Sequence, residues 1–128
     1  MSAIDVVGQY GAAAAAGDMG ALAKVLSDDV VWHQPGHNQL SGDHYGPASV
    51  VGHLGRFMQL SNGTFALTTE SATESGSLVV TTVRFTAQRE GVADLDQHGV
   101  DVFRVEDGRI AEVWLIGEDQ ETEDRFWG

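Results

Sequence analysis

The chain contains no cysteine and few basic residues, and both shortages narrow its possible functions. Without cysteine there is no disulfide framework, no thiolate metal site and no thiol nucleophile. Seven Lys and Arg residues face nineteen Asp and Glu residues, a formal net charge of −12 that repels phosphate backbones and anionic lipid surfaces alike. We therefore expect neither a nucleic-acid partner nor a membrane partner.

Long hydrophobic runs are also missing, since no apolar stretch reaches the length that spans a bilayer. The first seventeen residues, MSAIDVVGQYGAAAAAG, carry no basic leader, and their apolar positions recur at helical spacing. They are interpreted as a mature helix rather than a signal peptide, and a cytoplasmic location is the default expectation. With 42% hydrophobic residues, the chain is expected to form one domain over residues 1–128, large enough for a core and a cavity.

Hydrophobic periodicity predicts helices first and strands second. The predicted helices cover residues 2–16 and 19–26 and a segment from Gly46-Pro47 to Asn62-Gly63; the strands cover 30–33, 65–73, 78–89 and a hairpin over 98–116. Residues 36–46 are expected to form a polar loop, and Phe126-Trp127 to dock a short terminal helix. This order indicates an α+β fold with an antiparallel meander.

The hairpin is centred on Glu106-Asp107-Gly108, because Asp-Gly between two apolar runs is typical of a tight antiparallel turn. If Gly108 takes the left-handed position of a turn with a bulge, one face of the hairpin carries Gly99, Asp101, Phe103, Ala111, Val113 and Leu115. An acid among apolar groups is protonated, paired or functional, since burying a lone charge is too costly. We therefore expect a raised pKa for Asp101.

The opposite face of the strands is too apolar to remain in water. It carries Val80, Val100, Val102, Trp114 and Ile116. We expect a homodimer that covers this outer face of the sheet.

The order of elements, with the stretches SDDVVWHQPG, SGDHYG and VDVFRVEDGRIAEVW, resembles the SnoaL-like family of the nuclear-transport-factor-2-like superfamily over essentially the whole chain. The resemblance implies a cone-shaped curved antiparallel sheet wrapped around a long N-terminal helix with two further helices, enclosing an apolar pocket, commonly in dimers. It specifies the function less closely, because this fold hosts isomerases, cyclases, epoxide hydrolases and non-catalytic binders.

Similarity to ketosteroid isomerases of the same superfamily implies roles for two residues. Their oxyanion-hole tyrosine lies seven residues before a Gly-Asp pair, as Tyr10 does, and their protonated oxyanion-hole aspartate precedes a V-x-R run, as Asp101 does. The position of their general-base aspartate is held here by Gln34, whose amide takes no proton at neutral pH.

Two other activities of the superfamily fit less well. SnoaL-like polyketide cyclases carry an acid after the Trp of an E-x-W pattern, where this chain has Leu115. Epoxide hydrolases need an Asp-Arg-Asp set in the pocket, whereas alternation points Arg84 and Arg104 outward.

A base must therefore come from elsewhere, and His37 and His44 on the polar loop are candidates because a histidine titrates near neutrality. Surface polarity is the simpler explanation for either one taken alone. His33, His37 and His44 match no dense ligand spacing, so neither a metal nor another cofactor is expected.

The pocket wall is expected to bind a largely apolar molecule that carries a carbonyl or hydroxyl group. Its predicted substrate-binding residues are Trp32, Gln34, Phe57, Thr81, Phe85, Phe103, Val113 and Leu115. The sequence favours a small cofactor-independent isomerase, cyclase or lyase that stabilises an enol or enolate through Tyr10 and Asp101. A non-catalytic dimeric protein that binds a small apolar ligand is the alternative, and a structural Tyr-Asp hydrogen bond is the plainer explanation of the pair.

Overall fold

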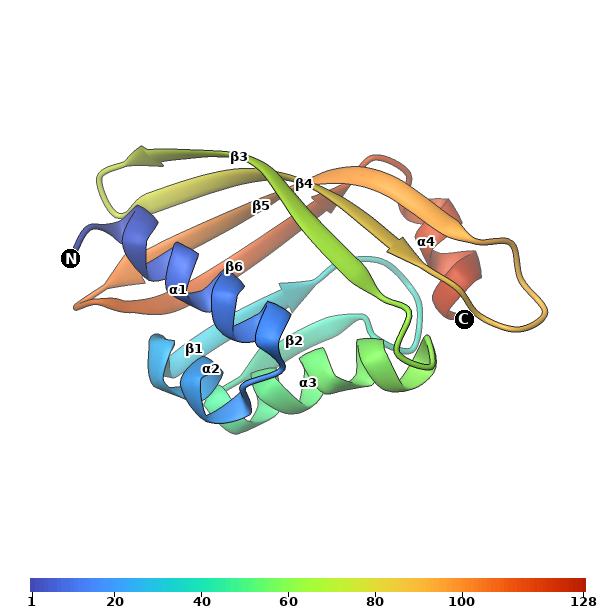
Figure 1. The fold of residues 1–128 in the computed structure, drawn as a ribbon, viewed down its shortest axis with the longest axis horizontal. Helices are drawn as coiled ribbons and strands as arrows, with labels where there is room; N and C mark the ends of the chain where they lie inside the picture. Colours follow the sequence, from blue (N-terminus) through green and yellow to red (C-terminus); the bar gives the residue numbers. More distant parts are fainter.

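A six-stranded sheet curls around its own concave side, and the helices pack against that inner side (Figure 1). The computed structural model describes residues 1–128. The helices are α1 (Ala3–Ala16), α2 (Met19–Val25), α3 (Pro47–Leu60) and α4 (Gln120–Trp127). The strands are β1 (Leu26–Gln34), β2 (Gly42–Tyr45), β3 (Ala66–Ser75), β4 (Leu78–Ala87), β5 (Leu95–Glu106) and β6 (Arg109–Gly117), in the order β2-β1-β6-β5-β4-β3.

The predicted α+β class and curved sheet are confirmed, but two details of the prediction are wrong. The sheet is mixed, because β1 runs parallel to β6, whereas a purely antiparallel sheet was expected. The loop expected over residues 36–46 contains the edge strand β2, which pairs antiparallel with β1. Four residues in a polar segment carry too little alternation to reveal a strand, and alternation alone does not reveal which partner a strand pairs with.

The β5–β6 hairpin differs from its prediction in the position of its bulge. Asp107 and Gly108 both have a left-handed backbone, with φ of 52° and 73°, as a two-residue type I′ turn requires. The bulge lies further along β6, where the pairing shifts by one residue beside Arg104 and Val105. Alternation had placed Ile110 outside, whereas the shifted register turns it into the core, where it is 0% exposed.

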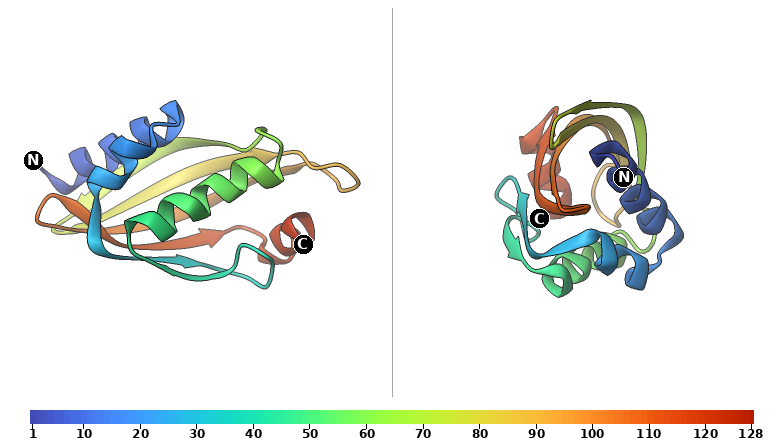
Figure 2. Two further views of the ribbon diagram at one scale, coloured as in Figure 1. Left: turned by 90° about the horizontal axis from the view of Figure 1, so that it is seen from below. Right: turned by 90° about the vertical axis from the view of Figure 1, so that its left-hand side faces the viewer.

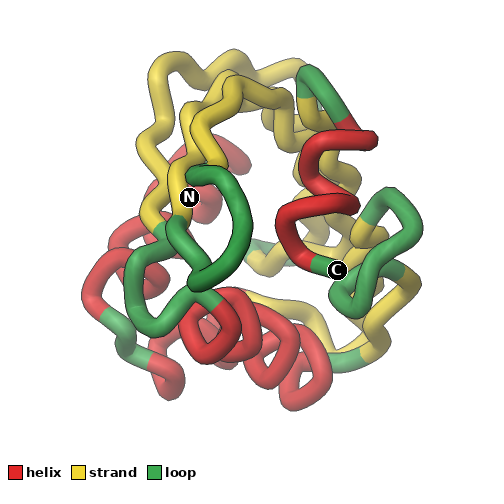
Figure 3. The backbone as a smooth tube through the Cα atoms, turned by 90° about the vertical axis from the view of Figure 1, so that its right-hand side faces the viewer, coloured by secondary structure: helices red, strands yellow, loops and turns green.

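The helices occupy different ends of the inner side. Helix α1 contacts β3 to β6, whereas α4 contacts β5 and β6 at the far end of the long axis (Figure 2). Figure 3 looks along the molecule from that end, with α4 at one side of the curled sheet and α3 below it. Side chains cap the N-termini of the first and last helices: Ser2 and Asp5 form a capping box on α1, and Asp119 caps α4.

The buried apolar residues divide into two clusters. The first, here called the α1 cluster, contains Val6, Val7, Leu26, Val30, Trp32, Val50, Val79, Phe103, Val105, Ile110 and Val113. The second, the α4 cluster, contains Leu40, Phe57, Val83, Phe85, Ala87, Leu95, Phe126 and Trp127. The terminal helix therefore docks through its aromatic pair, as predicted. None of the four helices combines the length and the apolar character of a membrane-spanning helix.

Truncation of Ile110 tests the shifted register. We expect Ile110→Ala to lower the free energy of unfolding by about 2–5 kcal/mol, because it leaves a cavity in the α1 cluster. Urea unfolding at high dilution is the measurement. Ile116→Ala, the same change on the exposed face of the same strand, is the control and should stay within about 0.5 kcal/mol of the wild type. Equal losses in the two variants would contradict the register.

Candidate functional site

Six polar residues lie inside the curl between the two apolar clusters, one from each of six elements. They are Gln34 from β1, His44 from β2, His53 from α3, Thr81 from β4, Asp101 from β5 and Glu123 from α4, and we call them the polar belt. Their place follows from the sequence around them. On β4, for example, Thr81 alternates between Val79 of the α1 cluster and Val83 of the α4 cluster.

The strand register aligns part of the belt in one row. Thr81 pairs with Asp101, and Asp101 pairs with Leu115. In the parallel pair, Trp32 lies beside Val113, so the same register carries Gln34 next to Leu115. Because paired residues of neighbouring strands point to the same face, these side chains share the inner side of the sheet.

Tyr10 enters this region from α1. Its ring centroid lies 5.5 Å from that of Phe103 and 6.3 Å from that of Trp32. Burial, and then the negative charge of Asp101, raise the pKa of Tyr10 above its ordinary value. No hydrogen bond joins Tyr10 and Asp101. The structure therefore lacks the Tyr-Asp hydrogen bond that would have given the pair a purely structural role.

Asp101 is enclosed by protein, and burial raises its pKa from 3.8 to about 7. Even so, the side chains of Tyr10, Asp101 and Leu115 are only partly buried. A residue that is largely desolvated but only partly buried is surrounded by protein on most sides, yet some of its atoms remain in contact with water. The Asp101 carboxyl can therefore carry a proton near neutral pH.

Gln34 is the centre of a hydrogen-bonded group. Its Oε1 accepts hydrogen bonds from Trp32 Nε1 at 3.0 Å and from His53 Nε2 at 2.9 Å. The proton of His53 is thus assigned to Nε2, and Nδ1 is left as a buried acceptor without a partner. The ring of His44 stacks on that of His53, with 3.8 Å between centroids.

His53 is a site residue that the sequence analysis missed. Burial, and then the neighbouring charges of His44 and Arg56, lower its pKa to about 3, so it is neutral at physiological pH. Its helical spacing between Val50 and Phe57, both buried, was the available signal. Since the same spacing also marks ordinary core positions, it does not by itself indicate a site.

Glu123 was missed as well. Glu123 is 8% exposed and shares the buried face of α4 with Phe126 and Trp127. Burial, and then the charges of Asp124, Asp101 and Asp119, raise the pKa of Glu123 to about 7. The spacing of three and four residues to the aromatic pair was the signal.

The three remaining histidine candidates lie in different parts of the structure. His44 was expected on a polar loop but lies on β2, and its ring belongs to the belt. His37 is exposed beside α4, where its backbone N–H donates to Asp124. His33 is on the outer face, with Nδ1 2.8 Å from Asp43 and Nε2 2.6 Å from Glu112, and its hydrogen bond to Glu112 is the largest of the effects that raise its pKa.

The predicted substrate-binding residues all lie on the inner side. Trp32, Phe103 and Val113 belong to the α1 cluster, Leu115 packs against it, Phe57 and Phe85 belong to the α4 cluster, and Gln34 and Thr81 belong to the belt. The apolar members of this set therefore flank the belt on both sides.

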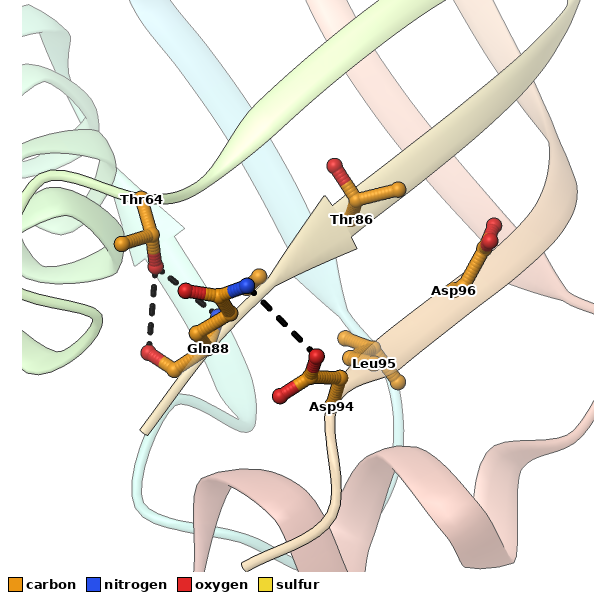
Figure 4. Close-up of a pocket in the computed structure, with 7 residues that line it drawn as sticks. Thr64, Thr86, Gln88, Asp94, Leu95 and Asp96 are labelled. Carbon is orange, nitrogen blue, oxygen red and sulfur yellow. Dashed lines mark hydrogen bonds between the residues drawn. The ribbon is translucent and has the colours of Figure 1, made fainter. Parts of the chain in front are cut away.

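One cavity lies away from the belt, at the ends of β4 and β5. It encloses about 470 Å³ and is lined by Thr64, Thr86, Ala87, Gln88, Asp94, Leu95 and Asp96 (Figure 4). Its polar groups bind one another: Thr64 exchanges two hydrogen bonds with the Gln88 backbone, and Gln88 Nε2 donates to Asp94. This cavity includes none of the predicted site residues, and its groups are already occupied, so we place the candidate site at the belt.

The raised pKa of Asp101 predicts a pH-dependent stability. The folded state keeps this proton where the unfolded chain has lost it, so the stabilisation is complete below the unfolded pKa of 3.8 and is lost as the pH rises toward about 7. Over that range, the free energy of unfolding of the wild type should fall relative to that of Asp101→Asn. Urea unfolding at several pH values measures this difference, and parallel curves for the two proteins would contradict it.

Comparisons with known proteins place this geometry in a family. Proteins of Mycobacterium tuberculosis and Mycobacterium bovis, described as uncharacterized, are 30% identical over 125 residues, which cover 97% of this chain and 95% of theirs. The crystal structure of a Xanthomonas campestris protein of unknown function with a cystatin-like fold is 46% identical, with a TM-score of 0.92, covering 100% of this chain and 99% of that one.

A more distant solved structure shares the fold alone. IdmH, a polyketide cyclase candidate from Streptomyces antibioticus, is 21% identical with a TM-score of 0.75, covering 92% of this chain and 93% of its own. Residues 7–113 match the family model of the SnoaL-like domain. Because it covers more than half of the chain, this match shows that the chain belongs to the SnoaL-like family.

Proposed function

We propose that the protein is a small cofactor-independent enzyme that transfers a proton next to a carbonyl group of a hydrophobic small molecule, as an isomerase, cyclase or lyase. The observation that supports this most is the Asp101 carboxyl, whose pKa is raised to about 7 by burial on the inner face that Tyr10 also reaches. A neutral acid beside a phenol provides two hydrogen-bond donors for one substrate oxygen.

The two donors act on the oxygen that gains charge. When a proton leaves the carbon next to a carbonyl, negative charge develops on the carbonyl oxygen. Donors fixed in a water-poor site stabilise that charge more than the neutral ground state. In this proposal Tyr10 and protonated Asp101 bind the oxygen, the Nε2 group of Gln34 orients the substrate, and the aromatic rings of the two clusters bind its apolar body.

His44 is one candidate for moving the proton, because its ring stacks on His53 within the belt. The exposed position of His37 makes it a weaker candidate. The polyketide cyclase candidate shares only the fold, but ring closure through an enolate would use the same two donors.

A non-catalytic binding protein is the second candidate function, and one observation favours it. Gln34 stands where ketosteroid isomerases carry their base, and its Oε1 already accepts two hydrogen bonds from Trp32 and His53. A protein with this arrangement would bind an apolar ligand without turnover.

We also propose that a second copy of the chain covers the outer face of the sheet. On this face Val80 is 38% exposed and Ile116 is 61% exposed, and both lie near the stacked pair of His33 and Trp114. Such a continuous apolar surface is rarely left in water.

Light scattering after size-exclusion chromatography tests the dimer. We expect a dimeric mass for the wild type and a monomeric mass for Ile116→Asp, because a charge at the centre of this face opposes its burial. Met58→Asp, a change at an exposed apolar residue of α3, is the control and should stay dimeric. A monomeric wild type at every concentration would contradict the proposal.

Deuterium exchange tests the proton-transfer function. In heavy water the wild type should exchange the protons next to the carbonyl of β-tetralone, followed by mass spectrometry, and Asp101→Asn or Tyr10→Phe should slow the exchange about 100-fold or more, as loss of an oxyanion donor does. Asp96→Asn, on the outer face of the same strand, is the control. Wild-type activity should fall as the pH rises through about 7, where Asp101 loses its proton. Tight binding of β-tetralone without exchange would instead support the binding protein.

A further inference from the structure

The carboxyl group of Glu123 lies in a space that the absence of a side chain at Gly117 keeps open. Gly99 and Gly117 pair across β5 and β6, and both have the inward parity of Asp101 and Leu115. A Cβ at Gly117 would collide with Oε2 of Glu123, and a Cβ at Gly99 would come within 2.8 Å of the Ile116 carbonyl oxygen. Any larger residue at position 117 would therefore displace the carboxyl from the inner face.

This position brings Glu123 near Asp101. Gly99 precedes Asp101 by two residues on the same face, which is about 7 Å along a strand. Asp101 thus has Phe103 and Tyr10 on one side and the Gly99–Gly117 pair on the other, and the Glu123 carboxyl lies against Gly117 of that pair. The two buried acids and the phenol follow one another along the inner side of β5.

No positive charge compensates Glu123. The charged groups that act on it are Asp101 from β5 and Asp119 and Asp124 from its own end of the chain, all of them acidic. Gln97, a buried residue of β5 with the same inward parity, binds the backbone of Asp119 instead. Oε2 is buried without a hydrogen-bond partner, an arrangement that is costly and that calls for an explanation.

We propose that Glu123 is the group that carries the proton in this site, a task that the amide of Gln34 cannot perform. The inference rests on the proposed function and adds a residue that neither the family resemblance nor the comparisons assign. His53 is a weaker base than Glu123, because burial lowers the pKa of His53 to about 3.

The proposed proton transfer uses only Glu123, Tyr10 and Asp101. The ionised Glu123 takes a proton from the carbon next to the carbonyl, and the electron pair of the broken C–H bond forms a C=C bond. The carbonyl electron pair moves to the oxygen, which Tyr10 and protonated Asp101 hold. In a substrate that carries a C=C bond beside that carbon, the intermediate is a dienolate. Glu123 then returns the proton to the far carbon of the dienolate while the C=O bond re-forms, which completes an isomerisation and restores the carboxylate.

Two interacting acids titrate as a pair, so the active form carries one proton shared between them. With one proton on the pair, Asp101 can donate a hydrogen bond while Glu123 accepts a proton. With two protons the base is lost, and with none the oxyanion donor is lost. The proposal therefore requires a bell-shaped dependence of exchange on pH.

The experiment compares Glu123→Gln with Glu121→Gln, the same change at an exposed position of the same helix, and with His44→Asn. β-Tetralone exchange in heavy water measures proton transfer, and the binding of naphthol, an enolate mimic, measures the oxyanion donors separately. We expect Glu123→Gln to bind naphthol like the wild type but to lose exchange at least about 100-fold, together with the acid limb of the pH profile. Glu121→Gln should retain both exchange and binding.

The outcomes separate the inference from the proposed function. Exchange that survives in Glu123→Gln but disappears in His44→Asn would overturn the role of Glu123 and leave the function standing. A wild type that neither exchanges β-tetralone nor binds naphthol would overturn both.

A second measurement remains decisive if turnover is too slow to follow or if Glu123→Gln is poorly folded. The carboxyl carbon of Asp101, titrated by NMR, should show a lower apparent pKa in Glu123→Gln or Glu123→Ala than in the wild type, because one like charge has been removed. An unchanged Asp101 titration in a variant with a native circular dichroism spectrum would overturn the coupling on which the proposal depends.

Discussion

Burial of two acids without a neighbouring cation is the constraint on which the rest of this interior depends. Asp101 and Glu123 face an apolar inner side, and desolvation raises the pKa of each to about 7. A carboxylate in such a place is unstable unless it takes up a proton or meets a charge. The site is therefore poised to gain and lose protons near neutral pH, and this property links the architecture to a reaction that moves protons.

The fold places these acids between two groups of apolar residues that stabilise it. The α1 cluster and the α4 cluster pack at the two ends of the inner side, and the belt lies between them. Because both clusters consist of apolar residues, their burial supplies the free energy of folding. The belt between them can then contain buried polar atoms without hydrogen-bond partners, such as His53 Nδ1 and Glu123 Oε2. Partly accessible Tyr10 and Asp101 lie where the two regions meet.

Inner and outer histidines illustrate how one sheet creates two environments. His53, inside and bonded to Gln34, is neutral because burial lowers its pKa. His33, one residue before Gln34 but on the opposite face, contacts two carboxylates, and its pKa is raised. Strand alternation alone separates the two faces, so adjacent residues on β1 serve the interior and the proposed dimer surface respectively.

The sequence by itself determined the fold class, most elements and the inward parity of Asp101, because these depend on local periodicity, turn residues and alternation. The resemblance of its motifs to a known family also singled out Tyr10 as a site residue. Only the tertiary structure decided that β1 pairs parallel with β6, that Ile110 turns inward and that His53 and Glu123 join the interior. The reason is physical: strand partners, bulge positions and the burial of a charged side chain are set by contacts between segments far apart in the chain, which no local pattern records.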